Sequence, residues 1–381
     1  MLESFLHAKP LFYEEIDYTR MPRIYKTLKE RLKIPKIIHI IGTNGKGTTG
    51  RFLATVLHNL SYNVGHYTSP HILEFNERIW MNGACVSETR LNEVHYELLE
   101  LLSQEDAEAL SYFEYTTFLA ILVYQDMDYI VLEAGLGGEF DATAVFPKVL
   151  TLVTPIDLDH EAFLGSSIKE IATTKLHAIE NFALIAKQKH NLVYDIAEKM
   201  QESRAISVQR VEELLDANDF LKIEEITRNN KLVPYLQENL KLAISALKFL
   251  EIVYREEDFR DAKLYGRLTQ IRENILLDVG HNTFAATAIV ESLKGFKYTL
   301  VYNSYKDKNY KEILTILKPI IEEVQIIAIT DERGESLVLM QETLEYLGIK
   351  SSLFQEIQEE KSYLVFGSFS VAEAFLREID E

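Results

Sequence analysis

The sequence predicts an α/β protein with two domains, each containing a mainly parallel β-sheet. Short runs rich in β-branched residues alternate with stretches of helical periodicity, and strands separated by helices form parallel β-α-β units. The strand-like runs are almost entirely apolar, which is typical of a sheet covered by helices on both faces. A chain of 381 residues has room for two or three domains of roughly 100–200 residues each.

The first half of the chain carries the larger predicted sheet. Its strands are expected at residues 36–41, 64–68, 128–133, 149–154 and 183–187. A helix is expected at 51–60, directly after a glycine-rich loop, and the spacing of apolar residues predicts another at 237–250,. The stretch 198–228 is charged and has no regular pattern, so we expect it to be irregular.

A second alternation follows a polar, highly charged stretch at 253–263, which we interpret as a linker. Its strands are expected at 275–278, 298–302, 324–329 and 364–366, with helices starting near 285 and 310 and a final helix at the end. The predicted domains are therefore 1–260 and 261–381. The second has about 120 residues, which is a normal size for a domain.

Composition restricts the classes of partner. The formal net charge is −19, which argues against binding nucleic acid or an anionic membrane surface through bulk positive charge. No apolar run approaches the roughly 18 residues of a membrane-spanning helix, and the N-terminus lacks a signal-peptide pattern. Cys85 is the single cysteine, which excludes an intrachain disulfide and a cysteine-rich zinc site and fits a reducing cytoplasm.

A glycine-rich loop after the first predicted strand has the pattern of a phosphate-binding site. Residues 42–49 read GTNGKGTT and lead into a predicted helix, as a phosphate loop requires. Glycines let the backbone approach an anion closely, and N–H groups at a helix start attract phosphate. Lys46 would reach the β- and γ-phosphates. The alternative is a flexible turn. The residues expected to bind the nucleotide here are Gly42, Asn44, Gly45, Lys46, Gly47, Thr48 and Thr49.

This loop departs from the common Walker A spacing. Ile40 stands where that pattern has its first glycine, and Gly47 separates the lysine from the following threonine,. The variant resembles the GTNGKGS loop of the folylpolyglutamate synthase and dihydrofolate synthase family, relatives of the Mur ligases, with Thr48 in place of serine. The resemblance implies an N-terminal P-loop ATPase domain with a parallel sheet and a smaller Rossmann-like C-terminal domain.

Two further segments at strand ends suggest a metal site. A carboxylate such as Glu133, at the carboxyl end of a parallel strand beside a phosphate loop, can ligate Mg²⁺. Residues 133–143, EAGLGGEFDAT, resemble the family's E-x-G-L-G-G-x-x-D-A-T stretch, which implies that Glu133 binds magnesium and Asp141 contacts the pterin. Residues 67–71, YTSPH, resemble its S-P-H segment, which implies Ser69 as a second ligand. Ordinary polar and glycine-rich turns are the alternatives.

The family also has a D-x-D-H unit and a lysine fifteen residues later. Here residues 157–160 read DLDH, and Lys175 has the matching position. The resemblance implies that His160 is a metal ligand and that Lys175 is carbamylated, since an uncharged amine can add CO₂. The alternative is an exposed helical lysine. Five positions around these motifs depart from the family's pattern: Glu139 replaces arginine, Ala144 replaces asparagine, Thr174 replaces glutamate, and Leu176-His177 replaces Ala-Gly.

Two helical segments resemble substrate- and nucleotide-binding parts of the family. Residues 111–117, SYFEYTT, resemble the lining of its pterin pocket, where Phe113 would stack on the ring and Glu114 would hydrogen-bond to it; core aromatics are the alternative. Asn239 matches the asparagine of the H-Q-x-x-N helix that reaches the nucleotide. Tyr235 and Leu236 replace the histidine and glutamine, and an ordinary polar residue at a helix start is equally consistent.

The second domain contains two more matches. Residues 266–268 read GRL and residues 278–282 read DVGHN, which resemble the family's G-R-L and D-G-A-H-N-P, with Thr283 in place of proline. The resemblance implies that Arg267 contacts phosphate, Asp278 the nucleotide and His281 the phosphates. An arginine fork matches phosphate oxygens well. A structural histidine is the alternative for His281.

The resemblance implies an ATP-dependent ligase that joins L-glutamate to dihydropteroate or a reduced folate through an acyl phosphate. Its catalytic residues would be Lys46, Lys175 and His281, its cofactors ATP and Mg²⁺, with K⁺ as an additional candidate. We expect a cytoplasmic monomer without nucleic-acid or membrane partners. One alternative is another Mur-type amide ligase. The segment before Gly42 argues against it, because that segment is too short for an additional UDP-binding domain. The other is a P-loop NTPase switch, which would need neither Arg267 nor His281.

Overall fold

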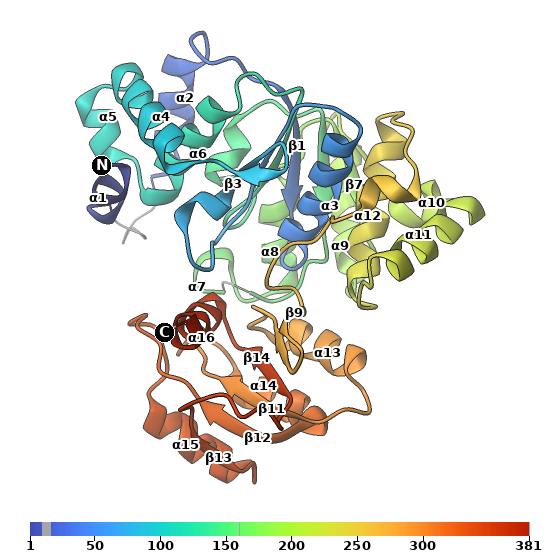
Figure 1. The fold of residues 1–381 in the computed structure, drawn as a ribbon. Helices are drawn as coiled ribbons and strands as arrows, with labels where there is room; N and C mark the ends of the chain where they lie inside the picture. Colours follow the sequence, from blue (N-terminus) through green and yellow to red (C-terminus); the bar gives the residue numbers. More distant parts are fainter. Residues whose placement is uncertain (10–16, 160, 381) are drawn as a thin grey trace. The chain divides into compact units, whose positions relative to one another are not determined.

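The computed structural model describes residues 1–9, 17–159 and 161–380. The chain divides into two compact units (Figure 1): Met1–Leu232 with Leu236–Ala262, and Val233–Tyr235 with Lys263–Glu381. Each unit contains one sheet made mainly of parallel strands. The predicted α/β class with two parallel-dominated sheets is therefore confirmed.

The first unit is built on an eight-stranded sheet in the order β4-β3-β2-β5-β1-β6-β7-β8. Its strands are β1 (Lys36–Ile41), β2 (Val64–Tyr67), β3 (Ile79–Met81), β4 (Ala84–Cys85), β5 (Tyr129–Glu133), β6 (Leu150–Val153), β7 (Phe182–Ile185) and β8 (Ser207–Arg210). Strand β1 pairs in parallel with β5 and β6, whereas β3 and β4 add an antiparallel edge. Because β1, β5 and β6 are adjacent and parallel, their carboxyl ends lie at one edge of the sheet.

Helices surround this sheet and form two buried apolar clusters. One cluster joins the N-terminal helices to α4 and α6, and the other joins α8 to α9; α3 packs against α12 (Figure 1). The helices are α1 (Leu2–His7), α2 (Arg20–Leu28), α3 (Lys46–Asn59), α4 (Glu88–Leu101), α5 (Gln104–Ala109), α6 (Tyr112–Val123), α7 (Glu161–Leu164), α8 (Ile168–Leu176), α9 (Leu192–Ser203), α10 (Val211–Leu214), α11 (Ala217–Asn229) and α12 (Leu236–Phe249). Short 3₁₀ helices are η1 (Phe75–Arg78), η2 (Ala142–Val145) and η3 (Glu256–Phe259).

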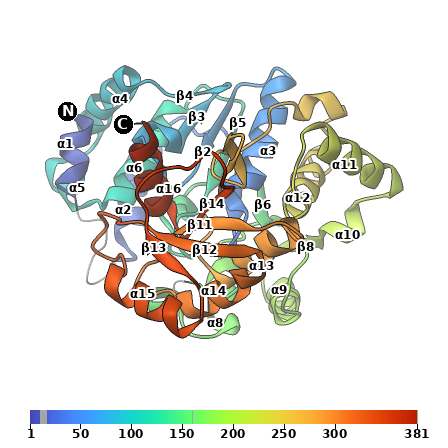
Figure 2. The same cartoon turned by 60° about the horizontal axis from the view of Figure 1, so that its bottom comes forward.

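The second unit is built on a six-stranded sheet in the order β13-β12-β11-β14-β10-β9, in which β9 alone is antiparallel to its neighbour. Figure 2 labels strands β11, β12, β13 and β14 of this sheet. Its strands are β9 (Thr269–Arg272), β10 (Ile275–Leu277), β11 (Tyr298–Tyr302), β12 (Ile321–Ile326), β13 (Ser351–Leu353) and β14 (Tyr363–Phe366). Its helices are α13 (Thr283–Ser292), α14 (Tyr310–Leu317), η4 (Lys318–Ile320), α15 (Leu337–Tyr346) and α16 (Phe369–Asp380).

The expectation of an irregular region at 198–228 is wrong. This stretch contains the end of α9, all of β8 and α10, and most of α11. Except for the buried Asp219, its charged side chains are at least partly exposed, while a few apolar residues such as Val211, Ile223 and Ile226 are buried. Asp216 caps α11 by accepting hydrogen bonds from the first turn, so the acidic residues that hid the pattern help to form the helix.

Other boundaries also differ from prediction. The first predicted helix begins at Lys46 rather than at residue 51, because Gly45 takes a left-handed conformation (φ +88°) that starts the helix directly after the loop. The strand expected at 324–329 is Ile321–Ile326, because Ile321 already pairs with β11. The predicted linker at 253–263 contains η3, whose Phe259 is fully buried. Among the described residues, no helix is both long and apolar enough to cross a membrane.

Replacing Phe259 with alanine should destabilise the first unit strongly. The Phe259 ring is fully buried with its centroid 5.5 Å from that of Tyr254, so its loss leaves a cavity and lowers the free energy of unfolding by about 3–5 kcal/mol. Trp80 is the single tryptophan and lies in β3, so its fluorescence during urea unfolding reports on this unit.

The matched control is Leu221→Ala in α11 of the same unit, because the Leu221 side chain is 65% exposed and its loss should change the free energy by less than about 0.5 kcal/mol. Equal urea midpoints for wild type and F259A would show that η3 is a linker after all.

Candidate active site

The loop between β1 and α3 is held against the segment that follows β6. The backbone N–H groups of Thr43 and Asn44 both donate to the carbonyl oxygen of Pro155, at 2.9 and 3.3 Å. The Thr43 hydroxyl donates to the carbonyl oxygen of Asp157 and accepts from its N–H, each at 3.1 Å. Gly42 has φ +137°, and a Cβ there would lie 2.8 Å from the Thr154 carbonyl oxygen. The loop therefore requires glycine at position 42 for close approach.

Two lysine side chains converge on this loop. The Lys46 amine lies 3.4 Å from the carbonyl oxygens of Gly42 and Thr43, and the Lys175 amine donates to the Gly42 carbonyl oxygen at 3.0 Å. Lys175 is only 3% exposed. Its burial in the last turn of α8 excludes the alternative of an exposed helical lysine.

The environment of Lys175 disfavours its charged form. Burial, and after it the nearby charge of Lys46, lower the pKa of Lys175 to about 7, although Asp159 and Asp141 oppose the shift. An ordinary lysine has a pKa near 10.4, so near neutral pH the uncharged amine is far more populated in Lys175 than in an ordinary lysine,. An uncharged amine is a nucleophile, and the structure places this one beside a phosphate-type loop.

Glu133 ends β5 at the same place. Its buried carboxylate accepts hydrogen bonds from the Thr68 hydroxyl and from the Ser69 N–H at 3.3 Å, and it lies 3.9 Å from the Lys46 amine. The structure thus brings together Ser69, Glu133 and Lys46, three of the residues selected from the sequence. The side chains of Ser69 and Glu133 carry oxygen atoms, the hard type of ligand that Mg²⁺ prefers.

The third predicted metal ligand, His160, lies outside the described residues. Among residues 1–9, 17–159 and 161–380, no group of three or more His, Cys, Asp or Glu side chains could hold a metal ion. The donors in the described region are a serine, a threonine and one glutamate. In chemical type this set fits a hard divalent cation, and Ser69 and Glu133 are the residues of the described region that would hold it.

The glycine-rich stretch after β5 packs on the end of α8. A Cβ at Gly138 would lie 2.6 Å from the Cα atom of Lys175, and the Glu139 N–H donates to the Thr174 carbonyl oxygen at 3.0 Å. The Asp141 carboxylate is buried and accepts three hydrogen bonds: from the N–H of Leu136 (2.7 Å) and from the N–H and hydroxyl of Thr143 (2.9 and 2.6 Å). These contacts lie within the loop and give Asp141 a structural role; its contact with substrate stays a prediction.

Glu114 already has a partner, which the sequence did not reveal. It forms a capping box with Ser111 at the start of α6 and pairs with Arg20 of α2 at 2.9 Å in a mostly buried contact. No motif marks Arg20, because it lies on a separate helix far away in the sequence. Phe113 lies over Gly135, where a Cβ would come within 2.5 Å of the ring, and its ring stacks near that of Tyr67.

Asn239 reaches the phosphate loop despite the missing family neighbours. Its side-chain amide donates to the Gly45 carbonyl oxygen at 3.2 Å and to the Thr49 hydroxyl at 3.3 Å. The packing of α12 against α3 produces this contact. A second group beside the loop was missed by the sequence analysis: Asp157 accepts hydrogen bonds from Lys189 and His190, each at 3.0 Å.

The three residues expected in the second unit lie near one another within it. The buried Asp278 carboxylate accepts hydrogen bonds from the Tyr235 hydroxyl and the Leu268 N–H, each at 2.8 Å, and from the Gly280 N–H at 2.7 Å. Arg267 directly precedes Leu268 in the chain, and its guanidinium carbon lies 5.6 Å from the centroid of the Phe369 ring. The His281 ring lies 3.2 Å from the Val279 carbonyl oxygen. Tyr235, a departure from the family pattern, thus supports Asp278.

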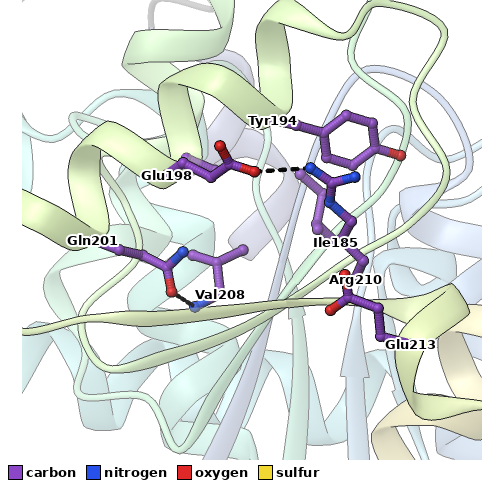
Figure 3. Close-up of a pocket in the computed structure, with 8 residues that line it drawn as sticks. Ile185, Tyr194, Glu198, Gln201, Val208, Arg210 and Glu213 are labelled. Carbon is purple, nitrogen blue, oxygen red and sulfur yellow. Dashed lines mark hydrogen bonds and ion pairs between the residues drawn. The ribbon is translucent and has the colours of Figure 1, made fainter.

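A separate pocket lies between α9 and the β8–α10 segment (Figure 3). Arg210 lies over the Tyr194 ring at 4.2 Å and pairs with Glu198 at 2.8 Å. The other residues that line the pocket are Ile185, Ala197, Gln201, Val208 and Glu213. None of the residues selected from the sequence lines this pocket, so it adds nothing to the site around Gly42.

The reactivity of the Lys175 amine should follow its lowered pKa. In competitive acetylation read by mass spectrometry, the neutral fraction of Lys175 should rise as pH increases through about 7, whereas the lysine of an unfolded peptide should show a midpoint near about 10.4. Lys46→Met removes a neighbouring positive charge and should move the Lys175 midpoint to higher pH. A wild-type midpoint for Lys175 equal to that of the peptide lysine would contradict the effect of burial.

Comparison with known proteins identifies relatives along the whole chain. No protein-family model matches the sequence. A curated dihydrofolate synthase/folylpolyglutamate synthase from Haemophilus influenzae is 29% identical over 371 residues, covering 87% of this chain and 82% of that protein. The crystal structure of Helicobacter pylori folylpolyglutamate synthetase is 39% identical, with a TM-score of 0.81 and coverage of 100% of this chain and 98% of the other. Escherichia coli FolC in complex with DHPP and ADP is 26% identical, with a TM-score of 0.81 and coverage of 99% and 96%.

These similarities extend over both units, and the resemblance first noted in the GTNGKGTT loop extends to residues that the fold brings together. Lys46, Glu133, Lys175 and Asn239 all lie around one loop. The chain belongs to the dihydrofolate synthase/folylpolyglutamate synthase family.

Proposed function

We propose that this protein is an ATP-dependent ligase that joins L-glutamate to the carboxylate of dihydropteroate or of a reduced folate. Members of its family are named for this carbon–nitrogen bond formation, and the Escherichia coli relative was solved with ADP and DHPP. The observation that carries the proposal is the convergence of Lys46, Lys175 and Glu133 at the Gly42 loop. The relatives do not favour a nucleotide switch or another Mur-type ligase.

The reaction has two steps. A carboxylate oxygen of the pteroyl substrate attacks the γ-phosphorus of ATP, the bond to the β–γ bridging oxygen breaks, and ADP leaves. The glutamate amine then attacks the acyl carbon of the acyl phosphate. A proton leaves the nitrogen and inorganic phosphate departs as the amide forms.

The first step brings two anions together, and their Coulomb repulsion must be offset. The first N–H groups of α3 and the Lys46 ammonium supply positive charge where the phosphates would lie. Glu133 holds Lys46 from the other side, and Asn239 fixes the start of α3 through Gly45. Catalysis on this basis is positioning and charge stabilisation by preorganised groups.

We assign Mg²⁺ to Ser69, Glu133 and His160, and K⁺ stays a candidate for an additional ion. A bound divalent cation supplies further positive charge to the phosphates. We propose that Lys175 is carbamylated: its uncharged amine attacks CO₂, an N–C bond forms and a proton passes to solvent. The burial of Lys175 and its lowered pKa support this modification. The product would be an anionic oxygen donor beside the loop.

Other predicted residues complete the proposed site. Arg267, Asp278 and His281 are proposed to contact the nucleotide and its phosphates, and Phe113 and Asp141 to contact the pterin. Phe113 and Asp141 are joined by Glu114 in the predicted pterin contacts. Because Glu114 forms an ion pair with Arg20, it would contact the pterin while its charge is balanced by the arginine. A cytoplasmic location and a monomeric state stay predictions.

The purified protein should add one glutamyl residue to dihydropteroate or tetrahydrofolate. ADP release should require ATP, Mg²⁺, glutamate and the pteroyl acceptor together. The reaction is monitored by detecting phosphate and by measuring the mass of the product. Lys46→Ala should lower kcat by about 100-fold or more, since it removes charge stabilisation in the transition state. Phosphate release without a mass gain for either acceptor would rule out the ligase.

Lys175 should carry a carbamate that ¹³C NMR detects after growth or incubation with ¹³C-bicarbonate. The signal should increase with bicarbonate and as pH rises through about 7, because only the neutral amine adds CO₂. Lys175→Ala should lose the signal and lower kcat by about 100-fold, with partial recovery on adding acetate or formate. A fully active K175A would exclude a catalytic role for the lysine.

A further inference from the structure

We propose that Glu139 and His177 form a clamp that positions Lys175 against the phosphate loop. The Glu139 carboxylate lies 3.2 Å from Nδ1 of the His177 ring. The pair connects the glycine-rich loop after β5 to the end of α8, the helix that carries Lys175. The inference deepens the proposed function and rests on it, since it concerns how the Lys175 amine is held for its role.

The end of α8 needs such support. The helix spans Ile168–Leu176, so Lys175 lies in its last turn and His177 is the C-cap residue. At this end the carbonyl oxygens of Thr173, Lys175 and Leu176 accept hydrogen bonds from N–H groups of the residues that follow, at 3.0 to 3.2 Å. The Thr174 carbonyl oxygen is left for a donor outside the helix. A histidine at this end also faces the favourable end of the helix dipole. The position of the Lys175 amine therefore depends on contacts outside α8.

The loop after β5 supplies these contacts. Gly138 lies directly on the Lys175 backbone, where any side chain would clash. The next residue, Glu139, donates its N–H to the Thr174 carbonyl oxygen at 3.0 Å and turns its carboxylate to His177. Backbone and side chain of one residue thus hold the positions on both sides of Lys175. Because the same loop starts at Glu133, the clamp also fixes the distance between Glu133 and Lys175.

Two departures from the family pattern meet in this pair. The resemblance described above implies arginine where Glu139 stands and Ala-Gly where Leu176-His177 stands. An arginine at 139 would repel a protonated histidine, and an alanine or glycine at 177 has no group to pair with. In this chain Glu139 and His177 each supply the partner that the other needs, so the two departures form one interaction.

The clamp should affect rate more than stability. Both side chains are partly exposed, His177 by 36% and Glu139 by 41%, and ion pairs at such sites add little to global stability. The Lys175 amine, however, is buried and aimed at Gly42. Displacement of a catalytic group by about 1 Å can reduce the rate by about 100-fold, so a loosened helix end has a kinetic effect.

The test compares three variants in the full-length protein: Glu139→Ala, His177→Ala and the exchange E139H/H177E. Each single variant should lower kcat by about tenfold or more, leave the KM for ATP within about twofold, and weaken the ¹³C-carbamate signal of Lys175. The exchange restores an acid–histidine pair and should recover most of both readouts. The melting temperature should stay within about 2 °C.

Asp126→Ala is the matched control, because Asp126 forms an exposed ion pair with Lys33 at 2.9 Å away from the loop. It should leave kcat and the carbamate signal unchanged. If the wild type itself shows no carbamate and K175A is active, the proposed role of Lys175 fails. If the wild type shows the carbamate and both single variants match it in signal and kcat, the clamp alone is refuted.

Discussion

The close approach of the phosphate loop to the turn after β6 is the constraint on which the rest of the site depends. Gly42 touches Thr154 so closely that no side chain fits, and its carbonyl oxygen faces both Lys46 and Lys175. Two amines at one carbonyl repel each other when both are charged. Burial and this repulsion make Lys175 the one that loses its proton readily, while Lys46 keeps its partner Glu133. The positive charge of Lys46 and the nucleophilic amine of Lys175 thus lie beside the same loop.

The parallel topology explains why the motifs meet. Strands β5, β1 and β6 are neighbours in the sheet, although the helices α3 to α6 lie between β1 and β5 in sequence. Parallel strands end at the same edge, and polar residues directly after such strands gather there. Glu133 after β5, the loop after β1 and Asp157 after β6 follow this rule. The lysine of α8 and the asparagine of α12 reach the same place because their helices pack beside it.

The departures from the family pattern obtain a physical explanation only in three dimensions. Tyr235 replaces a histidine and donates a hydrogen bond to Asp278. Glu139 and His177 both depart from the pattern and pair with each other. Glu114 matches the pattern, yet its charge is neutralised by Arg20 from α2. Tyr235, Glu139, His177 and Glu114 thus each have a partner far away in sequence, and no local pattern could have revealed these partners.

The sequence by itself determined the α/β class, the strand positions near β1 and the family, because apolar alternation, glycine spacing and the order of motifs are local properties of the chain. It misjudged 198–228, where charges on the solvent face obscured a buried helical face. Tertiary structure decided the rest: that Lys175 is buried with a pKa of about 7, and that Asn239 contacts Gly45. Burial and long-range contacts depend on how distant segments pack, and this information is absent from any short stretch of sequence.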